Sequence, residues 1–404
     1  MGQNETALER PSQNLGFLVT FIGFLDTPLL VPIIALYAAD LGAGVATVGL
    51  IVGVYSITNT AANVLGGHLV DRYGYKPPLL VGLAGDAVSM FAYALCRLPW
   101  HLAVVRALHG AGGGLVGPST MSYTALSYSK QRLGRGMALY GMAIGSATLL
   151  GTAGGGIIGD RFGYQYLFYI GGSLLLASVA MAALLRKRAT SALAKRRGLG
   201  NGLKDTVRLL ADVRFRLPYL SILAQYFAFG GIVTLLPLYL KGLGMTASLD
   251  TGILIAAFSA VFILVQFPAG GLSDRVGRLL PATIGLGIAG MSVVLLPIFP
   301  NMPFMIAIMV LFGLGYGLFF PALSAMVADK ASPEEYGRAT GLFHALLTVG
   351  VSVGAPVMGW IASYTGAAKG LSLSSVPLLV SLAIAMVILI NQKRPSRGRI
   401  DHRV

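Results

Sequence analysis

The sequence predicts an all-α membrane protein whose twelve transmembrane helices form two pseudo-symmetric six-helix bundles. Three observations lead to this fold class. The 404-residue chain is 55% hydrophobic and only 11% charged, and its mean hydropathy is +0.75. Its apolar runs have the length of membrane spans, and one charged phrase occurs twice, half a chain apart. A soluble domain of this composition would expose large apolar patches, so the bilayer is the expected solvent.

Twelve apolar runs bounded by charge are long enough to cross a membrane. A hydrocarbon core of about 30 Å requires roughly 20 apolar residues in a helix. Strands of a transmembrane barrel would instead alternate over about 10 residues, and these runs are apolar on every face. The expected spans are 15–38, 45–70, 77–97, 100–124, 135–159, 164–185, 217–240, 249–272, 280–300, 303–327, 338–363 and 371–391.

The repeated phrase divides the chain into two halves. "GGHLVDRYGYK" ends the second span and "GGLSDRVGR" ends the eighth, with Asp71 and Asp274 separated by 203 residues. The same offset aligns Gly110 with Gly313 and Pro118 with Pro321. One register that holds without a gap indicates two homologous six-helix units inserted in the same orientation.

The basic residues predict the topology. With both termini on one side, 25 of the 30 Lys and Arg residues fall on that side. The positive-inside rule assigns this side to the cytoplasm, and the expected location is the plasma (inner) membrane. Leu203, Val207, Leu210 and Val213 predict an amphipathic helix on the inner leaflet. The expected segments are a cytoplasmic tail (1–14), an N-terminal bundle (15–185), a basic linker (186–216), a C-terminal bundle (217–391) and a basic cytoplasmic tail (392–404).

The charged loop after the second span resembles a known signature. The stretch from Gly67 to Lys76 is similar to G-x-L-a-D-r-x-G-r-k of the major facilitator superfamily, which implies a secondary transporter working by alternating access. The resemblance implies that Asp71 meets the start of the eleventh helix and latches the halves together when the cavity opens outward. The alternative is that the phrase only marks the membrane boundary. The implied latch residues are Gly67, Asp71, Arg72, Gly74, Lys76, Asp274, Arg275 and Arg338.

Two glycine-rich stretches refine the resemblance. "RALHGAGGG" resembles the fourth-helix signature, and "GTAGGG" resembles the G-P-x-x-G-G signature of the twelve-span drug:proton antiporter branch, with Thr152 in place of proline. Glycines four residues apart share a helix face and permit close helix contact. The packing or antiporter-like glycines are Gly110, Gly114, Gly145, Gly151, Gly155 and Gly156.

Three charged residues lie well inside the expected spans, away from their ends. Asp26 falls near the midplane of the first span, where Pro28 and Pro32 loosen the helix. Arg106 lies in the fourth span, where placing a charged side chain in the membrane costs about 2.5–3.5 kcal/mol. Its presence therefore indicates a cavity or an acidic partner. We expect Asp26 to carry a proton under the influence of Arg106, and Asp86 in the third span is the second candidate.

Other polar residues in the spans are candidates for lining a substrate cavity or for joining helices. Histidine as a residue type titrates near neutrality, which draws attention to His344, but His68 and His109 are also histidines and no spacing selects among them. The cavity candidates are Asn59, Asn63, Gln225, Tyr226, Gln266 and His344.

The motifs favour transport over catalysis. No P-loop, H-E-x-x-H or metal-ligand spacing occurs, and Cys96 is the single cysteine. We therefore expect no catalytic residue, metal, cofactor or nucleic-acid partner, but a monomer that handles protons, membrane lipids and a small-molecule or lipid substrate. Proton-coupled export of a lipophilic or amphipathic compound is favoured. Uptake or facilitated diffusion of a polar nutrient and a non-transporting scaffold or sensor are the alternatives.

Overall fold

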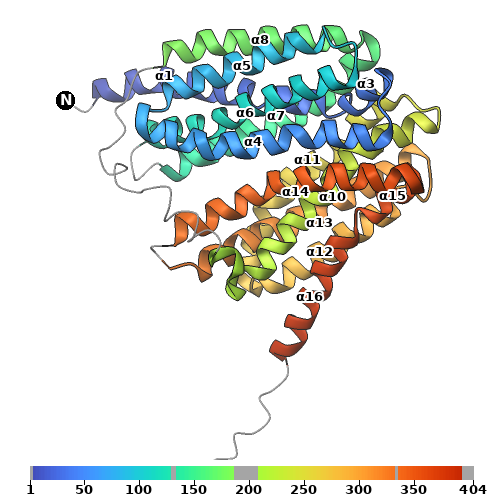
Figure 1. Ribbon diagram of the computed structural model, residues 1–404. Coiled ribbons are helices and arrows are strands. Elements are labelled where there is room, and N and C mark those ends of the chain that lie inside the picture. Colours follow the sequence, from blue (N-terminus) through green and yellow to red (C-terminus); the bar gives the residue numbers. More distant parts are fainter. Residues whose placement is uncertain (1–2, 129–132, 186–207, 333–334, 394–404) are drawn as a thin grey trace, which may run out of the picture.

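The computed structural model describes residues 3–128, 133–185, 208–332 and 335–393, and these are helical apart from short connections. The N-terminal half forms the upper layer in Figure 1. Its helices are α1 (Gln3–Gly23), α2 (Asp26–Leu30), α3 (Ile34–Asp40), α4 (Val45–Tyr73), α5 (Lys76–Tyr93), α6 (Pro99–Ser127), α7 (Leu133–Arg161) and α8 (Tyr164–Leu184).

The C-terminal half forms the lower layer in Figure 1. It begins with the short 3-10 helix η3 (Val213–Phe215) and ends with α16, which projects from the bundle. Its α-helices are α10 (Arg216–Gly242), α11 (Ala247–Val276), α12 (Leu279–Leu295), α13 (Met302–Lys330), α14 (Tyr336–Thr365), α15 (Ala367–Leu373) and α16 (Val376–Lys393).

The predicted fold class is confirmed, and the first span is broken where its prolines predict. Proline has no N–H to donate and disturbs the helix before it. Here α1 ends at Gly23, and Val31 N–H bonds to the Pro28 carbonyl three residues back, at 3.3 Å. The interruption places Asp26 at the first residue of α2, where its side chain is buried.

The twelve expected spans occur in order, with α1–α3 and α15–α16 as two interrupted spans. Within the described residues, nine helical segments are both long and apolar enough to cross a membrane. The other three spans are α5, α6 and α12, of which α12 has only 17 residues. Helix α5 carries Asp86, and α6 carries Arg106 and His109.

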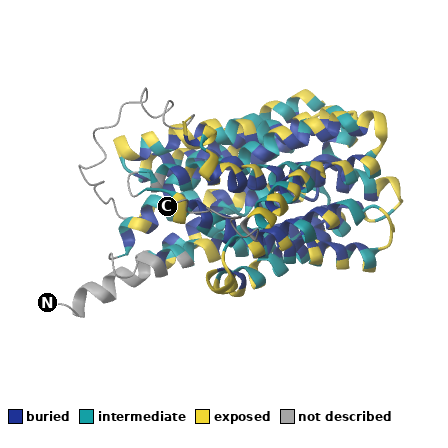
Figure 2. Ribbon diagram, turned by 90° about the horizontal axis from the view of Figure 1, so that it is seen from below, coloured by how far each residue is buried: buried dark blue, intermediate teal, exposed yellow. Residues whose placement is uncertain are grey.

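Each half has its own apolar core, and exposed residues cover the outer faces and ends in Figure 2. Glycines allow the closest helix contacts. A Cβ built on Gly110 of α6 would lie 2.3 Å from the Tyr55 carbonyl oxygen of α4. A Cβ on Gly114 would lie 2.6 Å from the Asn59 carbonyl oxygen. No larger side chain fits at these crossings without moving a backbone.

The two halves meet most closely at one face of the molecule. We call the face where α1 begins the terminal face and the other the opposite face. Near the opposite face, a Cβ on Gly49 would lie 2.4 Å from the Ala355 carbonyl oxygen and 3.0 Å from Gly359 Cα. A Cβ on Gly156 would lie 3.0 Å from Gly252 Cα. Backbone therefore touches backbone across the halves, and the opposite face is closed.

These two crossings are related by the internal repeat. Gly49 and Gly252 are 203 residues apart, and so are Gly156 and Gly359. Halfway along α4, the Thr60 hydroxyl donates a hydrogen bond across the halves to Thr348, at 2.7 Å. The inter-half contacts thus run from the opposite face to about the middle of the helices.

Candidate functional site: a buried polar cluster in the N-terminal half

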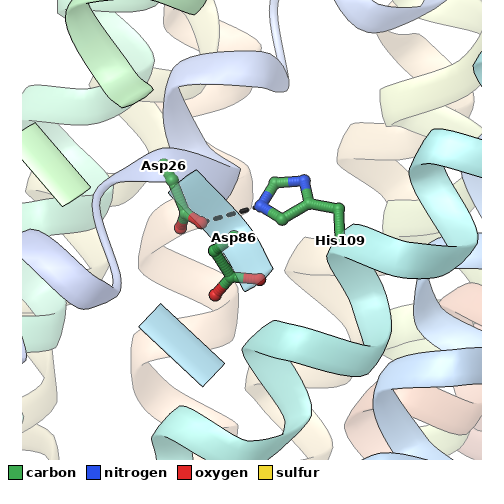
Figure 3. A group of neighbouring side chains, drawn as sticks. All are labelled: Asp26, Asp86 and His109. Carbon is green, nitrogen blue, oxygen red and sulfur yellow. Dashed lines mark hydrogen bonds and ion pairs between the residues drawn. The ribbon is translucent and has the colours of Figure 1, made fainter. Parts of the chain in front are cut away.

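Four ionisable side chains come together inside the N-terminal half. Asp26 of α2, Asp86 of α5, and Arg106 and His109 of α6 form what we call the polar cluster (Figure 3 shows three of them). Asp26 is 3% exposed, Arg106 is 4% exposed, and Asp86 and His109 are fully buried. In a membrane protein such a group is retained only where its charges balance one another or serve transport.

Asp26, His109 and Tyr93 form a hydrogen-bonded chain. His109 Nε2 lies 2.7 Å from Asp26 Oδ2, and His109 Nδ1 lies 2.9 Å from the Tyr93 hydroxyl. The other Asp26 oxygen accepts the Thr27 backbone N–H at 2.6 Å. Because Tyr93 can either donate or accept, the imidazole can hold its proton on either nitrogen or on both. The chain is therefore able to store and shift a proton.

Asp86 lies beside this chain. One ligand atom from each of Asp26, Asp86 and His109 fits within 4.8 Å of the others. Among the described residues neither Asp86 carboxylate oxygen has a hydrogen-bond partner within normal geometry. Gly112 leaves the space for this carboxyl group, since a Cβ there would lie 2.2 Å from Oδ1. Three groups that bind cations or protons thus share one closed site.

Arg106 borders the cluster through an aromatic ring. Its guanidinium carbon lies 4.4 Å from the Tyr55 ring centroid, and Tyr93 also interacts with it. The Tyr55 hydroxyl and the Thr27 hydroxyl are 2.7 Å apart. A cation over the face of a desolvated ring gains about 2 kcal/mol or more, which offsets part of the cost of burying the charge. No ion pair joins Arg106 to Asp26 among the described contacts.

The sequence reasoning missed three members of this site. His109 was one of several histidines that no spacing distinguished, and Tyr55 and Tyr93 were not candidates. One signal was available: Arg106 and His109 are three residues apart, so they share a helix face. The positions of Tyr55 and Tyr93 depend on how α4 and α5 pack on α6, which the sequence pattern does not supply.

Comparison with protein families agrees with the fold. The model of the Major Facilitator Superfamily matches residues 16–278 and 246–403. This chain belongs to the Major Facilitator Superfamily. It is accordingly an integral membrane protein and a secondary transporter of a small molecule, not an enzyme.

Named relatives of this superfamily member include efflux proteins. It is 28% identical over 357 residues to the multidrug resistance protein MdtG of Citrobacter koseri, covering 85% of this chain and 86% of that one. It is 26% identical over 330 residues to the multi-drug resistance efflux pump PmrA of Streptococcus pneumoniae, covering 78% and 79%. A bacterial homologue of the human lysosomal transporter Spinster, solved in an inward-facing and occupied conformation, matches with a TM-score of 0.81 at 13% identity, covering 96% and 98%.

The superfamily-like loop lies at the terminal face. Asp71 and Arg72 are exposed, and no ion pair of Asp71 is recorded within the described part of the chain. Gly74 ends α4 with φ +79°, and its repeat partner Gly277 ends α11 with φ +87°, so both loops turn through the conformation that glycine favours. Lys76 donates to the carbonyl oxygens of Ala183 and Leu185 at 2.6 and 2.7 Å.

The second copy of the charged phrase makes its ion pairs with residues of its own half. Arg278 pairs with Asp274 and, at 2.9 Å, with Asp329. Arg275 is exposed, and Arg338 is partly buried near the start of α14. These contacts raise the pKa of Arg278 through its hydrogen bond to Asp274. In this arrangement the two copies of the phrase therefore have different surroundings.

The antiporter-like glycines of α7 pack against two partners. A Cβ on Gly155 would lie 2.1 Å from the Leu29 carbonyl oxygen of α2, and one on Gly151 would lie 2.6 Å from Pro28. Gly145 instead faces Ile263 of the other half, with 3.3 Å to its Cδ1. Helix α7 of this superfamily member thus supports the broken first span on one side and meets the C-terminal half on the other.

The predicted cavity residues have different environments. Gln225 is fully buried, and its amide atoms have no hydrogen-bond partner among the described residues. Tyr226 bonds through its hydroxyl to Tyr316 at 2.9 Å. The others are partly or well exposed: Asn59, Asn63, Gln266 and His344.

Much of the predicted linker and tails lies outside the described residues, namely 186–207 of the linker and 1–2 and 394–404 of the tails. Of the residues predicted to form an amphipathic helix in the linker, Leu210 and Val213 are described, and both are exposed.

An ion pair crosses the halves at the opposite face. Lys241 Nζ of α10 lies 2.5 Å from Asp40 Oδ1 of α3, and the Tyr164 hydroxyl donates to Asp40 Oδ2 at 3.0 Å. Both charged side chains are about half exposed, at 52% and 41%. Solvent screening limits such a pair to roughly 0.2–1 kcal/mol.

We expect Lys241→Met to open the opposite face of this transporter only slightly. Loss of about 0.2–1 kcal/mol should change the ratio of closed to open molecules by less than about sixfold, and less still at high salt. Distances between spin labels across the opposite face would measure the change. A complete shift to the open state would contradict this prediction. It would show that the ion pair of Lys241, rather than the glycine crossings, holds the opposite face closed.

Proposed function

We propose that this transporter exports a lipophilic or amphipathic small molecule, or a lipid, in exchange for protons. In this proposal the protein lies in the plasma (inner) membrane with both termini on the cytoplasmic side. The polar cluster is the site that binds the proton. The single observation that carries the proposal is the enclosure of two carboxylates, an imidazole and a guanidinium in one half of the molecule.

The charges of the cluster leave room for one proton. With His109 neutral, the carboxylates of Asp26 and Asp86 outweigh the guanidinium of Arg106 by one negative charge. An unbalanced charge in a closed low-dielectric site costs several kcal/mol, so one proton held on the carboxylates or on His109 is the favoured state. A change that exposes the cluster to water removes this cost and releases the proton.

A resident divalent metal fits the same site less well than a proton. The distances among Asp26, Asp86 and His109 allow an ion. However, a divalent cation would leave the cluster with an excess positive charge beside Arg106, whereas a proton makes it neutral. The bond from His109 to Asp26 also uses the atom that a metal would need. The proton is therefore the coupling ion that we propose.

Alternating access supplies the exchange. In the structure the opposite face is closed by Gly49 and Gly156, and the cluster is sealed. We infer that rocking of the halves opens that face, forms the latch of Asp71 with the start of α14, and changes the access of water to Asp26. Export is favoured over uptake because the named relatives MdtG and PmrA are described as a multidrug resistance protein and an efflux pump.

The test is substrate-induced proton movement in proteoliposomes that contain wild type, Asp26→Asn or Asp86→Asn. We expect Asp26→Asn to abolish accumulation driven by a pH gradient while substrate exchange continues, because the amide keeps the shape of the carboxyl group but does not take up or release a proton. If Asp86→Asn alone loses proton movement, Asp86 is the carrier and the ranking reverses. If both variants move protons at the wild-type ratio, the polar cluster is not the coupling site.

A further inference from the structure

The C-terminal half carries aromatic rings where the N-terminal half carries its polar cluster. Adding the repeat offset of 203 to Asp26, Tyr55, Asn59 and His109 gives Phe229, Phe258, Phe262 and Phe312. Asp86 and Arg106 correspond to Ala289 and Met309. Every ionisable member of the cluster therefore has an apolar counterpart. The two halves share a fold but have different chemistry at equivalent positions.

The facing helices differ in the same way. Gly113 and Gly117 of α6 leave space for polar groups: a Cβ on Gly113 would lie 2.8 Å from the Tyr55 hydroxyl, and one on Gly117 would lie 3.5 Å from Asn63 Nδ2. Their counterparts in α13 are Tyr316 and Phe320. The space that glycines leave open in one half is filled by rings in the other.

The rings are arranged as a stack with an edge beside it. The rings of Phe262 and Tyr316 have centroids 4.4 Å apart and planes inclined by 19°. Phe258 is nearly parallel to Phe262, at 6.3 Å and 7°. Phe320 meets Phe262 edge-on, at 6.0 Å and 85°. Such faces and edges suit a further flat ring in offset or edge-to-face contact.

Part of this stack is accessible and borders the other half. Phe258 and Tyr316 are buried, whereas Phe262, Phe320 and Tyr226 are partly exposed. Ile263, next to Phe262, contacts Gly145 of the N-terminal half. His344, whose ring lies against Phe320, is exposed and is one helical turn from Thr348, which bonds to Thr60. The accessible rings therefore lie next to the inter-half contacts.

We propose that Phe262, Phe320 and Tyr226 form a subsite of the C-terminal half that binds a planar aromatic group of the substrate. This inference rests on the proposed export function and narrows its substrate class. It assigns ion handling to one half and recognition of the apolar, flat part of the cargo to the other. Phe262 is the specificity-determining residue, because it combines a stacked position with exposure.

The experiment compares two monovalent cations of different shape. Binding of ethidium, a planar aromatic cation, to the purified full-length transporter is measured by fluorescence anisotropy, and tetrapentylammonium, an aliphatic cation, serves as a competitor. The variants are Phe262→Leu and Phe320→Leu, which keep apolar volume and remove a ring. Phe267→Leu is the matched control, since Phe267 lies on the same helix but is 91% exposed. Thermal unfolding checks that each variant is folded.

We expect Phe262→Leu to raise the ethidium Kd about twofold to tenfold, the value of one aromatic pair, while tetrapentylammonium competes as in the wild type. Equal losses for both cations, an equal effect of Phe267→Leu, or no binding of ethidium by the wild type would overturn the subsite. Proton movement is measured separately, with a substrate that Phe262→Leu still transports. Loss of proton movement in Asp26→Asn tests the coupling site and does not depend on ethidium binding. The proposed coupling site and the proposed aromatic subsite can therefore fail independently of each other.

Discussion

Replacing Gly49 by leucine should trap the transporter with its opposite face open. A Cβ at this position would lie 2.4 Å from the Ala355 carbonyl oxygen and 3.0 Å from Gly359 Cα. Because the obstructing atoms are backbone, relief requires that α4 and α14 separate. Overpacking of this kind costs about 1–3 kcal/mol, which changes the ratio of closed to open molecules by about fivefold to more than a hundredfold. Transport should fall accordingly, since the cycle needs the closed state.

The matched control for this prediction is Gly141→Leu. Gly141 lies in α7, which forms the other inter-half crossing, and a Cβ there would meet nothing within 4 Å. Spin-label distances across the opposite face should lengthen for Gly49→Leu and stay at wild-type values for Gly141→Leu. Wild-type distances in both variants would mean that the glycine crossing is not the contact that closes this face.

Replacing His109 by phenylalanine should damage both stability and proton coupling. This change installs the residue that the C-terminal half carries at the equivalent position, Phe312. It leaves Asp26 and Tyr93 without their hydrogen-bond partner in a closed site. Each buried polar group so stranded costs about 1–3 kcal/mol, and more when it is charged. The thermal midpoint should drop measurably, and proton movement with substrate should be lost.

His109→Gln separates the two effects. A glutamine amide still donates to Asp26 but cannot take up a proton, so we expect most of the stability to return while coupling stays impaired. His68→Phe is the control, since His68 is exposed near the terminal face. Thermal unfolding and pH-indicator fluorescence in proteoliposomes provide the two readouts. Normal coupling in His109→Gln would remove the imidazole from the proton site and leave the carboxylates alone.

Much of the fold followed from the sequence because the bilayer imposes simple rules. Span length, apolar faces and the offset of 203 residues predicted the order of helices and the division into halves. Pro28 and Pro32 predicted the break in the first span. Helix ends were less accurate: the ninth span was expected at 280–300, and α12 ends at Leu295 because Leu296 and the following residues form a turn.

The site was only partly accessible from the sequence. Asp26, Asp86 and Arg106 could be found because a charge within a span is rare and costly. Their association with His109 depends on the tertiary packing of α2, α5 and α6, where Gly112 admits the Asp86 carboxyl group. No local pattern encodes that meeting. The aromatic stack of the C-terminal half was overlooked for a related reason, since aromatic residues in apolar spans attract no notice until the repeat and the ring geometry are considered together.

The two glycine crossings have a meaning beyond closure. Gly49 meets Gly359 while Gly252 meets Gly156, and each residue is the repeat equivalent of a residue in the other pair. This reciprocity, in which position i contacts j and j contacts i, defines an isologous contact between the subunits of a two-fold homodimer. One polypeptide therefore contains, between its two six-helix halves, the kind of interface that a symmetric homodimer has between its subunits. In a homodimer one substitution changes both subunits, whereas here a substitution in one half leaves the other half unchanged. The N-terminal half can therefore carry charged residues at positions where the C-terminal half carries aromatic residues.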